Sequence, residues 1–248
     1  MKIGSNYIIK IIQYVFRKLG YSISKIESQS DQIADLQKKI IGEKENVVIF
    51  DVGAYEGETV LDYFALFGKK SKIYAFEPFP KKFKKLEGAT TAYQNIKVYN
   101  FALGNKTDTV DFYVNNFHAT NSLLKSDPKS QEEWGKGLME TQKVIKVKMN
   151  TIDRFVEEKK IDQIDILKLD TQGSEHLVLE GARNSIKNGK IKLICAEIIV
   201  VPTYEGQKHY LDIIKMYHQL GFSLFNLFKY TNSEGKIRFF DGIFVYNN

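Results

Sequence analysis

Two glycines follow the first strongly apolar segment of the chain at a spacing that suits ligand binding. In VVIFDVGAYEGETV, residues 47–60, an apolar run ends at Asp51 and continues into Gly53 and Gly57. Glycines directly after a buried strand let the backbone turn sharply and let a ligand approach without an obstructing Cβ, while the following helix offers its backbone amides. Because the spacing differs from the G-x-G-x-x-G of dinucleotide-binding proteins, the pattern predicts a ligand loop of another kind.

Glu77 adds an acid to this predicted site. It closes the next strongly apolar run, KIYAF, which is expected to lie beside the first run in a parallel sheet. An acid at the end of that strand is placed to accept both hydroxyls of a ribose at the point where the strand order reverses. The glycine pair and Glu77 together predict an adenosyl ligand at the carboxyl ends of the strands.

Short apolar runs alternate with amphipathic stretches from Val47 onward, and these are the elements that must position the acid and the glycines. Such alternation predicts a largely parallel sheet with helices on both faces. The end of the chain differs, because SLFNLFKY and KIRFFDGIFVYN flank the turn sequence TNSEG and predict a closing antiparallel hairpin. The strands expected before the hairpin are VVIF, KIYAF, IKVYNFAL, IDILKLD and IKLICAEIIV.

Residues 1–44 are expected to form a helical appendage to a main domain of residues 45–248. The segment YIIKIIQYVFRKLG has an apolar helical face, but lysine, glutamine and arginine interrupt it, so we expect an amphipathic helix and no transmembrane segment. Isoleucines then recur every seven residues from Ile26 to Ile40, which indicates a homodimer formed through this appendage. Peripheral contact with the inner membrane is the alternative.

Composition narrows the classes of function. A chain of 248 residues suits one main α/β domain. The net charge of +6 comes from dispersed lysines, which favours anionic small molecules over nucleic acid as partners. The single cysteine, Cys195, cannot form an internal disulfide, so a cytoplasmic location is expected.

Five sequence blocks carry the most specific signal. They are FDVGAYEG (50–57), YAFEPFP (74–80), FALGN (101–105), MNTIDRF (149–155) and IDILKLDTQGSEHLVLEGA (164–182). In content and order they resemble the FkbM family of S-adenosylmethionine-dependent methyltransferases. The resemblance implies a class I, Rossmann-like α/β fold with a mostly parallel seven-stranded sheet, and it implies methylation of a hydroxyl oxygen.

The resemblance also implies a set of cofactor contacts. At two positions the chain departs from the family pattern, with Tyr55 where asparagine is frequent and Gln172 where glutamate is common. The first departure leaves the contacts at the methionine end of the cofactor pocket open. The second argues against any role of residue 172 that needs a carboxylate. The residues expected around S-adenosylmethionine are Asp51, Gly53, Tyr55, Gly57, Thr59, Glu77, Pro78, Phe79, Ala102, Leu103, Ser122 and Asp170.

Methyl transfer to a hydroxyl requires that the acceptor is held in line and that a base takes its proton. Asp170 ends IDILKLD and Glu197 ends LICAE, so both acids are expected to face the acceptor from neighbouring strands. Either acid is a candidate base, and His118, at the start of an irregular segment expected to act as a lid, is the third. The two acids are alternatively expected to hold Mg²⁺ or Mn²⁺ against the acceptor. The expected substrate contacts are Gln172, Glu175 and Tyr204.

The acceptor class is expected to be a sugar. The leading hypothesis is O-methylation of a nucleotide-activated sugar destined for a capsular or lipopolysaccharide. The alternatives are a non-sugar small molecule, such as a polyketide or a phosphoryl compound, and a non-catalytic partner subunit that binds the cofactor. A nicotinamide oxidoreductase is disfavoured by the missing third glycine, and an amino-methylating nucleic-acid enzyme by the lack of an aromatic-prolyl tetrapeptide.

Overall fold

A computed structural model describes residues 14, 18, 29–231 and 234–247. The chain divides into two units, residues 1–40 and 41–248. The helix α2 (Gln29–Ile41) agrees with the helical character expected of the appendage. Most of the appendage before α2, with the first isoleucine of the seven-residue repeat, lies outside the described residues. No helix in the described ranges has the length and hydropathy needed to cross a bilayer.

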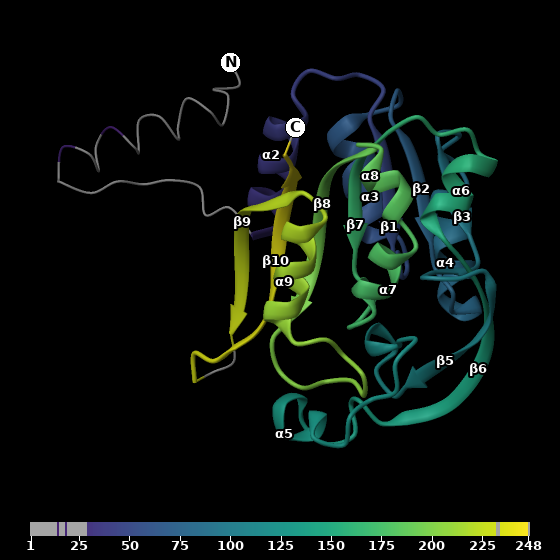
Figure 1. The fold of residues 1–248 in the computed structure, drawn as a ribbon, viewed down its shortest axis with the longest axis vertical. Coiled ribbons are helices and arrows are strands. Elements are labelled where there is room, and N and C mark those ends of the chain that lie inside the picture. Colours follow the sequence, from purple (N-terminus) through teal and green to yellow (C-terminus); the bar gives the residue numbers. More distant parts are fainter. Residues whose placement is uncertain (1–13, 15–17, 19–28, 232–233, 248) are drawn as a thin grey trace, which may run out of the picture. The chain divides into compact units, whose positions relative to one another are not determined.

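A seven-stranded sheet forms the centre of the second unit (Figure 1). Its strand order is β3-β2-β1-β7-β8-β10-β9, in which the first five strands are parallel and β10 is antiparallel to both of its neighbours. The predicted parallel sheet with its closing hairpin is therefore confirmed. The strands are β1 (Val48–Val52), β2 (Lys72–Phe76), β3 (Ile96–Tyr99), β7 (Ile164–Leu169), β8 (Ile191–Ile199), β9 (Phe222–Thr231) and β10 (Ile237–Tyr246).

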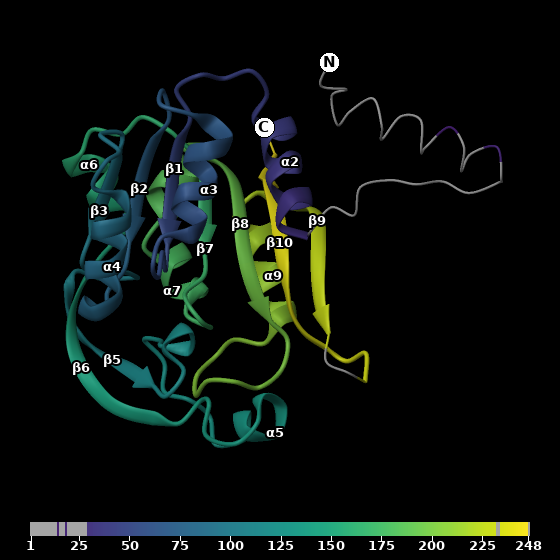
Figure 2. The same ribbon diagram turned by 180° about the vertical axis from the view of Figure 1, so that it is seen from behind.

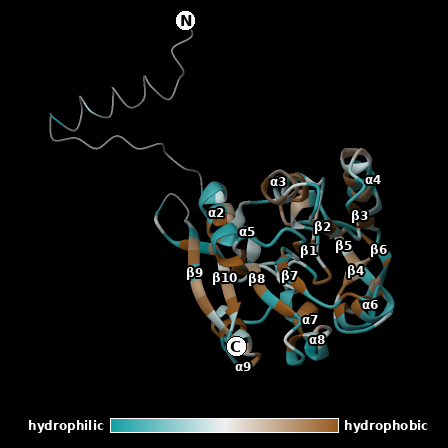
Figure 3. Ribbon diagram, turned by 90° about the horizontal axis from the view of Figure 1, so that it is seen from above, coloured by the Kyte–Doolittle hydropathy of each residue, from teal (hydrophilic) through white to brown (hydrophobic). Residues whose placement is uncertain are grey.

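Helices cover both faces of this sheet, as the sequence predicts. Figures 1 and 2 show α3 and α4 on one face and α6, α7, α8 and α9 on the other, and Figure 3 shows the same three layers from above. This arrangement buries both faces of the parallel strands, which explains their nearly continuous apolar sequences. The helices are α3 (Glu58–Phe67), α4 (Pro80–Thr90), α6 (Ile152–Glu158), α7 (Glu175–Glu180), α8 (Arg183–Lys187) and α9 (Tyr210–Gln219).

A three-stranded sheet of order β4-β6-β5 was not expected from the sequence. IKVYNFAL, predicted as one strand, is divided because Asn100 leaves the main sheet and its Nδ2 donates to the carbonyls of Glu77 and Pro78 at 2.8 and 3.1 Å. In Figure 1, β5 and α5 lie next to the carboxyl ends of the parallel strands. The remaining elements are β4 (Ala102–Leu103), β5 (Asp108–Asn115), η1 (His118–Thr120), α5 (Ser130–Trp134) and β6 (Thr141–Asn150).

The core beneath α6 determines which side chains reach the other face of the sheet. The Phe155 ring of α6 makes edge contacts with Phe50 and Phe76, at centroid distances of 5.6 and 5.0 Å. Side chains alternate along a strand, so the burial of Phe50 on this face directs Asp51 to the opposite face. The polar residues of the site therefore come from strand positions between, or just after, the apolar core residues.

Candidate active site

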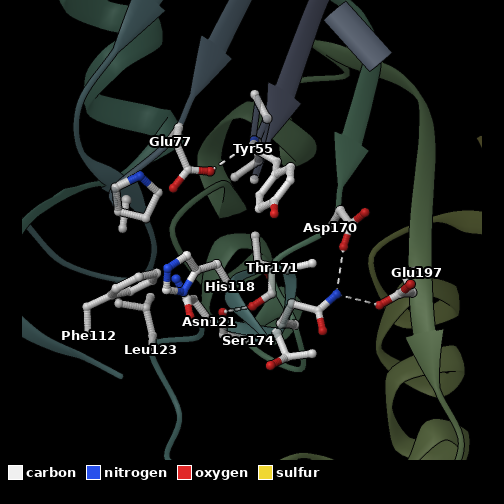
Figure 4. Close-up of a pocket in the computed structure, with 18 of the residues that line it drawn as sticks. Tyr55, Glu77, Phe112, His118, Asn121, Leu123, Asp170, Thr171, Ser174 and Glu197 are labelled. Carbon is white, nitrogen blue, oxygen red and sulfur yellow. Dashed lines mark hydrogen bonds between the residues drawn. The ribbon is translucent and has the colours of Figure 1, made fainter. Parts of the chain in front are cut away.

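A cavity of about 410 Å³ lies at the carboxyl ends of β1, β2, β7 and β8 (Figure 4). This volume is within the range of small-molecule sites, and the end of an open parallel sheet is where such sites form. The segment predicted as a lid contributes Phe117, His118 and Trp134 to its lining. The predicted site residues that line the cavity are Gly53, Tyr55, Thr59, Glu77, Pro78, Ala102, Leu103, His118, Asp170, Gln172 and Glu197.

Gly53 forms the sharp turn that opens the cavity. Its φ is 86°, in the left-handed region that favours glycine. A Cβ at this position would lie 1.9 Å from the carbonyl oxygen of Asp170, so β7 approaches the turn too closely for any side chain. Gly57 has φ of 101° but lies outside the lining, and a Cβ there would crowd Leu86 of α4 at 2.9 Å. The two glycines therefore serve the cavity and helix packing respectively.

Substituting Gly53 with alanine is expected to lower the free energy of unfolding by about 2–4 kcal/mol, because left-handed strain adds to a backbone clash. Gly68→Ala is the matched control: its φ is 73°, and within the described part of the chain a Cβ there meets nothing within 4 Å. Because the ψ of Gly68 is −169°, a conformation that strains any side-chain-bearing residue, we expect the control to lose about 1–3 kcal/mol from backbone strain alone, and less than Gly53→Ala. Urea unfolding followed by circular dichroism measures both, and equal losses would show that the contact with Asp170 does not constrain the turn.

Glu77 is held rigidly with its carboxylate at the cavity. Its Oε2 accepts a hydrogen bond from the Tyr55 backbone amide at 2.9 Å, and its Oε1 accepts one from Phe79 at 2.8 Å. The residue is only 6% exposed, and this burial raises the pKa of its carboxyl to about 7. Each carboxylate oxygen keeps a second lone pair for a ligand hydroxyl. Phe79 itself lies behind this carboxylate, outside the lining, with its ring against His118.

Asp51 is not brought to the cavity. It is 1% exposed and lies beside Lys168 of β7, its partner in the strand register. Burial raises the pKa of its carboxyl to about 7, and its Oδ2 has no hydrogen-bond partner among the described residues. Asp51 does not line the cavity, so its contact with the cofactor stays a prediction. The Asp51 side chain lies on one face of the sheet. The turn after β1, which contains Gly53, forms the cavity wall instead.

An apolar lobe of the cavity lies next to Glu77 and Pro78. Figure 4 shows Phe112, Leu123, His118 and Asn121 gathered there. The Asn121 Oδ1 accepts a hydrogen bond from the Asn115 amide at 2.8 Å, which fixes the side chain. Its Nδ2 is buried and has no partner within the described ranges. A fixed donor without a partner in a cavity wall is suited to an acceptor atom of a ligand.

His118 and Ser122 have other positions than those predicted. The His118 ring lies in the apolar lobe, apart from Asp170 and Glu197 (Figure 4), with Nδ1 3.1 Å from the Asn115 carbonyl oxygen. It is therefore not placed beside the acids as a base. The Ser122 hydroxyl donates to the Gln172 carbonyl at 2.7 Å and lies behind the lining. Its role is to hold the loop after β7.

Gln172 joins the two acids predicted to face the acceptor. Its Nε2 donates to Asp170 Oδ1 at 2.9 Å and to Glu197 Oε1 at 2.8 Å. A glutamate at this position would lack these donors, so the departure from the family pattern suits this arrangement. The Tyr204 hydroxyl lies 3.0 Å from Gln172 Oε1 and 2.9 Å from the Thr120 carbonyl oxygen, outside the lining. Tyr204 therefore orients Gln172 and does not itself line the cavity.

The predicted cation between Asp170 and Glu197 is not supported by this geometry. An amide nitrogen, which is a donor, lies between the two carboxyl groups where a cation would need acceptors. Among the residues that the structure describes, no group of three or more histidines, cysteines and acids is arranged to hold a metal ion.

Lys168 places a positive charge beside the acids of the site. This residue was not identified from the sequence. Its Nζ lies 3.4 Å from Asp170 Oδ2, and its side chain is only 12% exposed. Burial, followed by the charge of Asp170, raises the pKa of the Glu197 carboxyl well above its usual range. This shift favours the protonated form of Glu197, and Asp170 is the acid that lies beside the ammonium of Lys168. A lysine within the buried run IDILKLD was the signal that could have identified it.

Glu175 was expected to contact substrate but stabilises the loop instead. Its Oε1 accepts hydrogen bonds from the amide and hydroxyl of Thr171, both at 3.0 Å, and from the Gly173 amide at 3.2 Å. The side chain is buried outside the cavity lining. It therefore fixes the loop in which Gln172 adopts a φ of 55°.

Comparisons with known proteins agree with this fold. A family model described as the methyltransferase FkbM domain matches residues 51–224. A curated relative, the 2-O-methyltransferase NoeI of Sinorhizobium fredii, is 23% identical over 175 residues, which cover 66% of this chain and 68% of that protein.

Two solved structures share the fold. The methyltransferase FkbM of Methylobacillus flagellatus superposes with a TM-score of 0.53 at 16% identity, covering 82% of this chain and 44% of that one. An rRNA methylase of Streptococcus thermophilus has a TM-score of 0.50 at 12% identity, covering 91% and 100%. This chain thus spans less than half of the Methylobacillus protein. The family model, in contrast, covers most of the chain, and the chain is a methyltransferase that belongs to the FkbM family.

Proposed function

We propose that the protein transfers a methyl group from S-adenosylmethionine to a hydroxyl of a sugar. The observation that carries this proposal is that one cavity joins an anchored carboxylate, Glu77, to a pair of acids, Asp170 and Glu197. Glu77 suits the hydroxyls of a ribose, and the pair of acids suits an acceptor hydroxyl that must lose a proton. The similarity to a relative named as a 2-O-methyltransferase supports an oxygen acceptor.

The chain's own residues fit the cofactor. Glu77 would accept hydrogen bonds from the ribose hydroxyls, and Asn121 Nδ2 would donate to a ring nitrogen of the adenine. Ala102, Leu103 and Phe112 supply apolar contact in the same lobe. When bound, S-adenosylmethionine supplies an electrophilic methyl group, so that an S–C bond breaks as the new C–O bond forms.

Asp170 acts as the base in this proposal. It takes the proton of the acceptor hydroxyl while Lys168 balances its charge at 3.4 Å. The raised pKa of Glu197 favours its protonated form, which in this proposal donates a hydrogen bond to a neighbouring oxygen of the acceptor. Gln172 keeps the two carboxyl groups in fixed positions, so the acceptor meets a preformed site.

Release of S-adenosylhomocysteine tests the reaction. Nucleotide sugars, methyl glycosides, polyketides and phosphorylated compounds are offered in turn, each with Mg²⁺ or Mn²⁺ and with EDTA. We expect turnover with a sugar, as a nucleotide-activated precursor of a surface polysaccharide, and we expect it to persist in EDTA because Gln172 lies between the carboxyl groups. Turnover with only a non-sugar compound would overturn the sugar assignment, and binding of cofactor without any turnover would favour a non-catalytic partner subunit.

A further inference from the structure

The cavity extends beyond the two acids to a surface that the proposed chemistry does not use. Four side chains form this surface, here called the acceptor wall. They are Trp134 from α5, Met139 from the segment after it, Ile199 at the end of β8 and Phe239 near the start of β10. All four line the same cavity as Glu77 and Asp170. The wall is therefore continuous with the proposed methyl-transfer site.

The strand register fixes the distance between the wall and the acids. Ile199 follows Glu197 by two residues on β8, so both side chains lie on the same face of the sheet. Across the pair, Phe239 is opposite Ile199 and Asp241 is opposite Glu197. Two residues of a strand span about 7 Å, so the wall begins about the width of one sugar ring from Glu197.

The wall is held in place before any ligand binds. Trp134 Nε1 donates to the Thr203 hydroxyl at 3.0 Å. The Phe239 ring stacks on Tyr230 with centroids 4.5 Å apart and lies 6.1 Å from the Trp134 ring. An ion pair between Glu133 and Lys236 also ties α5 to the segment before β10. Such support lowers the entropic cost of binding, because the wall is already ordered.

The lining of the cavity thus combines this apolar wall with the hydrogen-bonding groups of Asp170, Gln172 and Glu197. A pyranose has the same combination, since one face carries only C–H bonds and its rim carries hydroxyls. The C–H bonds beside ring oxygens are polarised positively, and the faces of aromatic rings are negative, so the two attract. An alkyl chain would match the wall but would leave the hydrogen-bonding groups without partners.

We propose that the acceptor wall is the acceptor subsite and binds a pyranose ring by its C–H face while a hydroxyl of that ring reaches Asp170. This inference rests on the proposed function and specifies its substrate class. It assigns Trp134 and Phe239 to the binding of the sugar ring itself, independently of any nucleotide or lipid attached to it.

Direct binding tests the subsite without turnover. Trp134 is the only tryptophan in the chain, so the intrinsic fluorescence reports on this wall. A panel of methyl glycopyranosides is titrated at millimolar concentrations into the protein saturated with S-adenosylhomocysteine, and octanol is titrated as the alkyl probe. We expect a saturable change in emission with at least one glycopyranoside and none with octanol. A response to octanol alone, or to neither probe, would overturn the proposal.

Calorimetry on variants completes the test. For the glycopyranoside that binds, Trp134→Ala is expected to raise Kd about tenfold, and Trp134→Phe, which keeps an aromatic face, about twofold. The Kd of S-adenosylhomocysteine should stay unchanged in both variants, which shows that the fold is intact. Equal glycopyranoside affinity in wild type and Trp134→Ala would overturn the subsite. Failure of the wild type to bind S-adenosylhomocysteine would instead contradict the proposed function.

Discussion

Asp170→Asn is expected to reduce the rate of methyl transfer about 10³-fold while the affinity for S-adenosylmethionine stays unchanged. Removal of a positioned base costs about 10²–10⁴-fold in rate. The asparagine keeps an oxygen for the hydrogen bond from Gln172 Nε2, so the loop after β7 should keep its geometry. Single-turnover rates at saturating acceptor, with cofactor affinity from calorimetry, separate the two effects. A rate within threefold of wild type would remove Asp170 from the mechanism.

Glu197→Gln is the matched variant. Burial and the neighbouring charge of Asp170 raise the pKa of the Glu197 carboxyl and favour its protonated form, which a neutral amide resembles. We expect a loss of about tenfold or less, because the amide can still donate a hydrogen bond to the acceptor. If Glu197→Gln instead lost about 10³-fold and Asp170→Asn did not, the two acids would have exchanged roles.

The parts of the fold that the sequence predicts well are those with a continuous apolar pattern. The runs containing Phe50 and Ile166 are buried on both faces, and a strand buried in this way leaves a clear signal. The strands β5 and β6 were missed because most of their residues are at least partly exposed, so neither contains a long continuous apolar run. The alternation of Ile145, Val147 and Met149 with lysines was the signal that could have identified β6. Such strands depend on pairing with one another, which a single sequence does not display.

The residues of the candidate site also divide into those whose place the sequence predicts and those whose role it does not. Glu77, Asp170 and Glu197 were predictable because the carboxyl ends of parallel strands meet at one edge. The roles of Glu175 and Tyr204 were not, since both bond to a loop whose path depends on the left-handed φ of Gln172. The sequence alone therefore does not distinguish a polar residue that contacts the ligand from one that supports a ligand-contacting residue.

Tyr55 shows how a departure from the family pattern is accommodated. Its φ of 49° is one that asparagine adopts more readily. Lys82 compensates, because its ammonium lies 3.9 Å from the centroid of the Tyr55 ring and donates to the Tyr55 hydroxyl at 2.6 Å. The contact that matters for Glu77 comes from the Tyr55 backbone amide, which any residue except proline supplies. The anchor of the ribose-type carboxylate therefore does not depend on the side chain.

Glu77→Ala is expected to weaken S-adenosylmethionine binding about 10³-fold. Two hydrogen bonds from ribose hydroxyls to a charged acceptor contribute about 1.5–3 kcal/mol each. The substitution also removes the acceptor for the amides of Tyr55 and Phe79, so the edge of the cavity loses its anchor. Calorimetric titration with S-adenosylhomocysteine gives the affinity, and Gly68→Ala serves as a control for a change away from the cavity. Unchanged affinity would refute the ribose assignment.

The pH dependence of the same affinity tests the charge of Glu77. Burial raises the pKa of its carboxyl to about 7, and the ionised form is the one that accepts two ribose hydroxyls. Below this pKa most molecules are protonated and must release a proton to bind, so affinity falls as the pH falls. We expect Kd to be about tenfold higher at pH 6 than at pH 8.

Glu77→Gln has no such proton to lose, so its weaker affinity should be independent of pH. If the variant kept the slope of the wild type, the dependence would arise from Asp51 or Glu175, whose pKa values burial also raises to about 7, and Glu77 would not be the group that titrates on binding.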